Sequence, residues 1–273
     1  MHFDLLQSIS LAGHPDTPND DRVGCGDALA WVIDGATDLG EAGLLGARGG
    51  AAWLAMEANS GFASAGDGSI DSICKGVFAR VARRFDAQRT RDPVADWELP
   101  LGAFLIARVG AATIEYGWLG DCVGLLRRGE KVVWVGPQAG KDQESAWAAR
   151  FVGQGLGEKE RPEPILQSLR QSRSRSGKHL LGVDPTAAAH LDKAVIPCAP
   201  GDELLLMTDG FAALIEGYAA LTPEAMMAAL SVEGLAGLGK QLREIEAADA
   251  ACTRYPRFKQ SDDATAIWLR VAA

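Results

Sequence analysis

Short acidic clusters recur at four widely separated places in this 273-residue chain, and each stands beside an apolar run. The apolar runs, such as 30–33 and 203–207, are short, which is typical of β-strands. Carboxylates gathered at strand ends, with no Cys or His among them, are the ligands that Mg²⁺ or Mn²⁺ requires. The clusters are Asn19-Asp20-Asp21, Val32-Ile33-Asp34-Gly35, Leu206-Met207-Thr208-Asp209-Gly210 and Ser261-Asp262-Asp263-Ala264-Thr265.

The order of the expected elements favours an α+β fold in layers over the regular alternation of a parallel sheet. Strands come first and last, and helices form two groups between them. Helices are expected from about Leu44 to Met56, over 70–85, and around 211–217, 223–230 and 235–250. Four consecutive runs between Leu101 and Val135 are interpreted as an antiparallel meander. The remaining expected strands cover residues 3–11, 28–33, 193–197, 203–208 and 264–271.

Residues 137–180 are polar and rich in Gly, Ser and Arg, and we call this segment the flap. We expect it to be a flexible cover over the site, with a short helix near Glu144 to Phe151. The run from Arg170 to Lys178 is interpreted as a solvated loop. The chain as a whole, residues 1–273, is expected to form a single domain with a flexible flap at about 137–180.

The charge of the chain excludes some classes of partner. A net charge of −9 and a pI near 5.0 argue against nucleic acid or an anionic membrane surface. The N-terminus lacks a basic region followed by an apolar one, and no uncharged apolar stretch approaches ~20 residues, so a cytoplasmic protein is expected. We also expect a monomer. Five cysteines without CxxC spacing indicate reduced thiols, at Cys25, Cys74, Cys122, Cys198 and Cys252.

The full ordered set of motifs resembles the metal-dependent serine/threonine protein phosphatases of type 2C, in particular their bacterial members. That family shows Asn/Glu-Asp-Asp, Asp-Gly, Gly-Asp-Ser, Ser-Asp-Gly and Asp-Asn/Asp-x-Thr elements in this order. The chain supplies the first four as Asn19-Asp20-Asp21, Asp34-Gly35, Gly120-Asp121-Cys122 and Thr208-Asp209-Gly210. The fifth is Asp262-Asp263-Ala264-Thr265, so the resemblance spans nearly the whole chain.

This resemblance implies a four-layer αββα sandwich, with two antiparallel sheets flanked by helices. It also implies two Mn²⁺ or Mg²⁺ ions, and a third, weaker one, at one end of the sheets. By carry-over, Asp34 bridges both ions, the carbonyl of Gly35 binds one, Asp209 and Asp262 complete the cluster, and Asp21 holds a metal-bound water. Asp121 matches the position that helps to hold the third ion. The catalytic set is then Asp21, Asp34, Asp209 and Asp262.

Two positions depart from the family's pattern. Ala36 stands where eukaryotic members carry a histidine that can protonate the leaving oxygen. Asp16 stands where the family commonly has an arginine that binds the substrate phosphate. A substitute cation could come from the flap, and the weaker alternatives from the sequence are His14, Arg22 and Arg48.

The resemblance implies hydrolysis of phosphoserine or phosphothreonine in a protein, by a water bridging two metal ions, in opposition to a serine/threonine kinase. Asp16 and Ala36 motivate an alternative, a catalytically weak pseudophosphatase that binds a phosphoprotein as a regulator. A third reading is a phosphatase of small molecules. Retention of the clustered carboxylates favours the enzyme, because mutually repelling buried charges have no evident use in a binding module.

Overall fold

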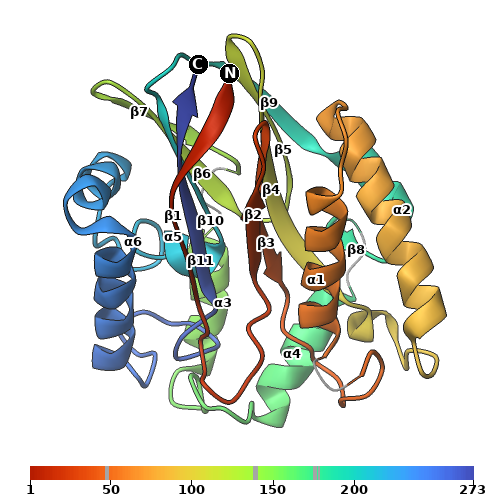
Figure 1. The fold of residues 1–273 in the computed structure, drawn as a ribbon. Coiled ribbons are helices and arrows are strands. Elements are labelled where there is room, and N and C mark those ends of the chain that lie inside the picture. Colours follow the sequence, from red (N-terminus) through yellow and green to blue (C-terminus); the bar gives the residue numbers. More distant parts are fainter. Residues whose placement is uncertain (47–48, 138–140, 175–176, 178) are drawn as a thin grey trace.

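The chain folds into four layers. The computed structural model describes residues 1–46, 49–137, 141–174, 177 and 179–273. Within these ranges, two antiparallel sheets face each other at the centre of the molecule and helices cover the outer face of each sheet (Figure 1). The predicted α+β class and the αββα sandwich are confirmed.

The first sheet, called sheet I, has five strands, and the first and last strands of the chain are neighbours in it. Its order is β1 (His2–Leu11), β11 (Ala264–Ala272), β10 (Glu203–Met207), β6 (Val123–Arg128) and β7 (Lys131–Val135). Successive side chains of β10 point to opposite faces of the sheet, and both faces are buried. Leu204 and Leu206 pack between the sheets, whereas Leu205 and Met207 pack against the outer helices.

The second sheet, sheet II, has the order β2 (Arg22–Cys25), β3 (Leu29–Gly35), β4 (Leu101–Val109), β5 (Thr113–Leu119) and β9 (Asp192–Pro197). The two-residue strand β8 (Leu181–Gly182) pairs with the start of β4. Strand β2 lies between the expected strands 3–11 and 28–33, where the sequence analysis predicted no strand. It pairs with β3, with Arg22 opposite Ile33, and so places the first acidic cluster next to the second.

The predicted meander from Leu101 to Val135 is wrong in one respect. The four strands exist, but β4 and β5 belong to sheet II and β6 and β7 to sheet I. The chain changes sheets at Gly120, whose φ of +87° lies in the left-handed region. A Cβ there would also collide with Ala103, so glycine is required at this crossing.

Helices α1 (Gly50–Ala63) and α2 (Ile70–Gln88) cover sheet II. The apolar stripe predicted for α2 is buried as expected. Helix α1 begins later than predicted, since Leu44 and Leu45 precede it, although both are buried in the same core. The short 3₁₀ segments η1 (Asp96–Glu98) and η3 (Pro185–His190) complete this side.

Helices α5 (Asp209–Ala212) and α6 (Pro223–Ala248) cover sheet I. The two helices expected at 223–230 and 235–250 form the single element α6 with a kink at Gly234, where φ is 68°. The Gln7 side chain accepts a hydrogen bond of 2.7 Å from the Leu235 amide at this kink. Strand β1 therefore compensates for the interrupted helical hydrogen bonding.

The flap contains more helix than its composition indicates. The helix predicted near 144–151 is confirmed as α3 (Lys141–Ala148) followed by η2 (Ala149–Phe151). A further helix, α4 (Glu163–Arg173), includes Arg170 and Arg173, so the loop interpretation is wrong for that part of the run. A small apolar cluster holds these elements, namely Ala148, Leu156, Ile165, Cys252 and Phe258.

Two further observations concern the whole chain. All five cysteines are free, as predicted from their spacing. Among the described residues, every helix is too short or too polar to cross a lipid bilayer.

Candidate metal centre

The strand directions bring three of the predicted ligands to one end of the sandwich. Asp34 is the second-to-last residue of β3, and Asp121 follows the end of β5 by two residues. Asp209 begins α5 directly after β10. These strands all run away from the end that carries the two termini, so the three carboxylates meet at the opposite end, where the flap helices α3 and α4 also lie (Figure 1).

Asp34, Asp121 and Asp209 form a compact group of carboxylates. Each offers an oxygen that lies within 4.8 Å of an oxygen from each of the other two. Oxygens on opposite sides of an octahedral Mg²⁺ are about 4 Å apart. The donor set is all oxygen and therefore suits a hard divalent cation, so these residues fit the ion that the sequence analysis predicted.

The electrostatics of this group also favour a bound cation. The pKa of the Asp34 carboxyl is raised well above its usual range, mainly by burial and then by the charge of Asp209. The charges of Asp21 and Asp121 and a hydrogen bond with Asp209 act in the same direction. Without a cation, protons must be retained within the group to limit this repulsion.

Asp21 is the most deeply buried of the predicted residues, at 2% exposure. Its carboxylate accepts a hydrogen bond of 2.8 Å from the Thr208 hydroxyl, and that hydroxyl accepts one of 3.0 Å from the Thr265 amide. Burial raises the pKa of Asp21, and the Thr208 hydrogen bond opposes this. Thr208 thus connects three of the acidic motifs, a role that the sequence analysis did not assign to it.

Asp262 lies at the edge of the centre and not in the group of three. Its carboxylate forms an ion pair with Lys259, and its side chain is 42% exposed. Its neighbour Asp263 points inward and accepts hydrogen bonds from the amides of Gly13, at 2.7 Å, and Asp20, at 2.6 Å. Asp263 therefore holds the loop that carries the first acidic cluster.

Gly35, which lies beside the cluster, is in close contact with neighbouring backbone, including that of Asp20. A Cβ on Gly35 would lie 2.7 Å from the Asp20 carbonyl oxygen and 3.0 Å from that of Ala51. Only glycine fits there, and binding of an ion by its carbonyl stays a prediction. Burial, together with the charge of Asp263, raises the pKa of Asp20 to about 7.

Asp38 is an acidic residue near the centre that the sequence analysis missed. Its carboxylate accepts hydrogen bonds from the Gly50 and Ala51 amides, at 2.6 and 3.2 Å, and so stabilises the start of α1. Asp38 precedes α1 by 12 residues in the sequence, outside the usual capping position. For that reason no local pattern could have identified it.

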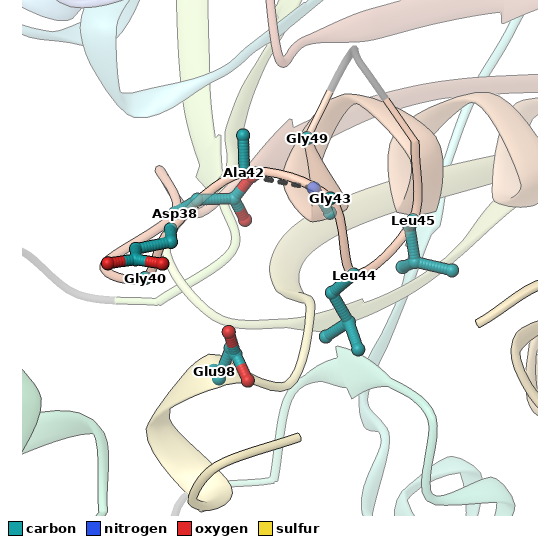
Figure 2. Close-up of a pocket in the computed structure, with 10 residues that line it drawn as sticks. Asp38, Gly40, Ala42, Gly43, Leu44, Leu45, Gly49 and Glu98 are labelled. Carbon is teal, nitrogen blue, oxygen red and sulfur yellow. Dashed lines mark hydrogen bonds between the residues drawn. The ribbon is translucent and has the colours of Figure 1, made fainter. Parts of the chain in front are cut away.

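The pocket beside Asp38 is too small for a substrate. Asp38 and Glu98 line one side of it and Leu44 and Leu45 the other (Figure 2). Its volume is about 20 Å³, which is room for a single water. Glu98 is already paired with Arg91 at 2.6 Å. The carboxylate group at the sheet ends is therefore the better candidate for a functional site.

Asp16, one of the two departures from the family pattern, and Arg22 have clear neighbours. Asp16 lies 3.3 Å from the Lys159 ammonium of the flap, and its amide donates to the His14 ring. Arg22 donates hydrogen bonds to the carbonyls of Asn19 and Asp21 and so serves the local turn. Arg48 and Arg175 lie outside the described residues.

The described basic residues of α4 are also occupied. Arg170 donates two hydrogen bonds to the Leu39 carbonyl, at 2.9 and 2.8 Å, and its guanidinium stacks over Trp97. Arg173 donates one of 2.9 Å to the Thr37 carbonyl. These contacts fasten the flap to the segment that follows β3.

Solved structures with a similar fold include bacterial serine/threonine phosphatases. The Mycobacterium tuberculosis serine/threonine phosphatase PstP/Ppp matches over 100% of both chains, with a TM-score of 0.62 and 17% identity. The catalytic domain of PstP in complex with two manganese ions matches over 100% of this chain and 99% of that one, with a TM-score of 0.58 and 17% identity. Stp1 from Staphylococcus aureus matches over 98% and 94%, with a TM-score of 0.54 and 15% identity.

These matches confirm the resemblance at the level of the fold. No protein-family model matches the sequence, and a comparison with curated protein sequences gives no match.

Proposed function

We propose that this chain is a type 2C serine/threonine protein phosphatase that uses two Mn²⁺ or Mg²⁺ ions to hydrolyse phosphoserine or phosphothreonine. The observation that carries the proposal is the group of Asp34, Asp121 and Asp209 carboxylates at the sheet ends. The same fold occurs in a structure of PstP in complex with two manganese ions. Fold and donor set together support a metal-dependent hydrolase more strongly than either alone.

In this proposal the strand ends hold the ions. Asp34, Asp209 and Asp121 supply carboxylate oxygens, and the carbonyl of Gly35 lies next to Asp34. Two hard divalent ions held there would lower the pKa of a water and polarise the phosphoryl oxygens. The Asp21 carboxylate, which accepts a hydrogen bond from Thr208, would accept one from such a water.

Asp262 joins the centre by releasing Lys259. One oxygen of its half-exposed carboxylate contacts Lys259 and accepts a hydrogen bond from the Asp263 amide, and the other oxygen would be available to an ion. The Lys259 ammonium would then remain beside the centre as a cation for an anionic substrate.

Activity measurements test the proposal and separate it from its alternatives. The protein with Mn²⁺ should hydrolyse both an aryl phosphate and a phosphothreonine peptide, and Asp34→Asn should remove both activities. Asp67→Asn is the matched control, because Asp67 is exposed and lies in the loop between α1 and α2. Turnover of the aryl phosphate alone would favour a phosphatase of small molecules. Binding of the peptide without turnover would favour the pseudophosphatase.

A further inference from the structure

Two cations, Lys259 and Arg161, interact with the acidic motifs at the sheet ends. Lys259 pairs with Asp262, and the charge of Asp34 also acts on its ammonium group. Arg161 interacts electrostatically with Asp262, with Lys259 and with Arg173. In an acidic protein this concentration of positive charge needs an explanation.

The segment that carries Arg161 is fixed at two points close to the site. Gly157 forms a β-bridge with Lys259, three residues before Asp262. Gly157 has a φ of +75°, and a Cβ there would lie 2.8 Å from both the Ala250 carbonyl oxygen and the Cys252 sulfur. Lys159 pairs with Asp16 at 3.3 Å. The flap therefore runs between the loop before β2 and the loop before β11, and both loops carry acidic motifs.

Arg161 differs from the neighbouring basic residues in how its guanidinium is used. Lys259 is paired with a carboxylate, and Arg22, Arg170 and Arg173 donate to backbone carbonyls. Arg161 donates no hydrogen bond to any other described residue, although its side chain is only partly exposed. A guanidinium has five N–H donors, and those of Arg161 are not buried away from solvent, so they are available to a ligand.

We propose that Arg161 binds the phosphate group of the substrate, in place of the arginine that the family carries at the position of Asp16. This proposal rests on the proposed function. A guanidinium binds phosphate through two parallel charge-assisted hydrogen bonds. Arg161 belongs to the flap and lies near enough to Asp262 and Lys259 to interact electrostatically with both.

The environment of Arg161 supports this role. Burial lowers the pKa of its guanidinium, and the nearby Asp262 carboxylate offsets only part of this effect. A cation in such surroundings is stabilised when an anion arrives. If metal draws Asp262 away from Lys259, that ammonium can contribute to the same phosphate site.

Binding of inorganic phosphate to the Mn²⁺-loaded protein tests the proposal directly. Isothermal titration calorimetry should show a loss of phosphate affinity of about 10-fold or more in Arg161→Gln, because hydrogen bonds to charged groups contribute about 1.5–3 kcal/mol. Arg161→Lys should lie between wild type and Arg161→Gln, since it keeps the charge but not the paired donors. Arg150→Gln is the matched control, because Arg150 is exposed and lies in the same flap.

Kinetics with an aryl phosphate provide a second readout. Arg161→Gln should raise KM and the inhibition constant of phosphate by similar factors, while the Mn²⁺ affinity stays within about twofold of wild type. Unchanged phosphate binding in Arg161→Gln would overturn the proposal. A fall in Mn²⁺ affinity or thermal stability that Arg161→Lys shares in full would assign Arg161 a structural role and would also overturn it.

The test separates this proposal from the proposed function. If the wild-type protein binds phosphate through Arg161 but turns nothing over, the phosphate site stands and the catalytic proposal fails. If turnover is intact and Arg161→Gln binds phosphate as the wild type does, the catalytic proposal stands and the Arg161 assignment fails.

Discussion

Asp209→Asn should make the metal-free protein more stable while removing its response to Mn²⁺. Asp209 shares a hydrogen bond with Asp34, and both lie in the group whose oxygens are within 4.8 Å of one another. An asparagine has nearly the same shape, and its amide can donate the hydrogen bond that a protonated Asp209 would donate. The fold is therefore preserved while one negative charge is removed.

The size of the effect follows from the geometry. Two unit charges 4.8 Å apart repel by about 3 kcal/mol at an effective dielectric constant of about 20. Protons retained in the wild-type group already relieve part of this repulsion, so we expect a gain of about 1–2 kcal/mol. For a domain of this size that corresponds to a rise in Tm of roughly 2–8 °C in EDTA.

Thermal unfolding in EDTA and in Mn²⁺ measures both parts of this prediction. Wild type at an Mn²⁺ concentration of about 100 times Kd should gain about 2.7 kcal/mol, and Asp209→Asn should gain much less. Asp67→Asn should match wild type in both buffers. The reasoning is refuted if Asp209→Asn melts below wild type in EDTA, or if Mn²⁺ stabilises it as much as wild type.

Three other predictions concern the metal requirement, the Thr208 hydroxyl and the buried carboxylate of Asp249. Chelation should abolish phosphatase activity, and Mn²⁺ or Mg²⁺ should restore it; full turnover after exhaustive chelation would exclude the metal mechanism. Thr208→Val should lower the free energy of unfolding by about 1–3 kcal/mol in urea titrations, because it removes one hydrogen-bond donor from the buried Asp21 carboxylate and the acceptor of the Thr265 amide. Asp249→Asn should lower stability by about 2 kcal/mol at neutral pH. Burial alone would raise the pKa of Asp249, but hydrogen bonds from the Arg254 amide and the Arg257 guanidinium lower it to about 2. The contribution is therefore present above about pH 4 and is lost as the pH falls toward 2, so acid unfolding curves of wild type and variant should converge there.

The fold could be predicted where a local pattern determines burial. The alternation along Leu204–Met207 and the stripe from Ile70 to Phe85 each require an apolar partner on a defined face, and the structure supplies it. The same patterns place Asp34 and Asp209 where buried strands end. That these two strand ends lie close together could be predicted only from the family resemblance, which rests on the order of the acidic motifs. The period and composition of a strand do not specify which strands are its neighbours.

The assignment of β6 and β7 to the other sheet could not be predicted in this way. A strand that turns back on its neighbour and one that crosses to a facing sheet have the same alternation of side chains. The difference lies in Gly120, whose left-handed backbone and contact with Ala103 redirect the chain. Taken alone, a glycine before an aspartate is also the sign of an ordinary hairpin turn.

Helix α4 was missed because its partners are distant in the sequence. Arg170 and Arg173 look like part of a solvated basic run, but their guanidinium groups reach carbonyls more than 130 residues away. Asp38 is comparable, since it stabilises the start of a helix that begins 12 residues later. Long polar side chains that satisfy remote backbone groups leave no periodic signal.

Asp16 connects the question of catalysis with that of phosphate binding. In the sequence, an acidic residue at the position of the family's arginine weakens the case for an enzyme, because a carboxylate repels a dianionic substrate. In the structure, Asp16 pairs with Lys159, which stands two residues before Arg161. An exposed pair of this kind contributes at most about 1 kcal/mol, so its main effect is to position the flap. An aspartate at 16 is then compatible with hydrolysis provided that the flap supplies the cation that the loop has lost. If Arg161 binds the substrate phosphate as proposed, phosphate binding depends on the short segment of residues 157–161, and turnover depends on that segment together with the carboxylates at the sheet ends.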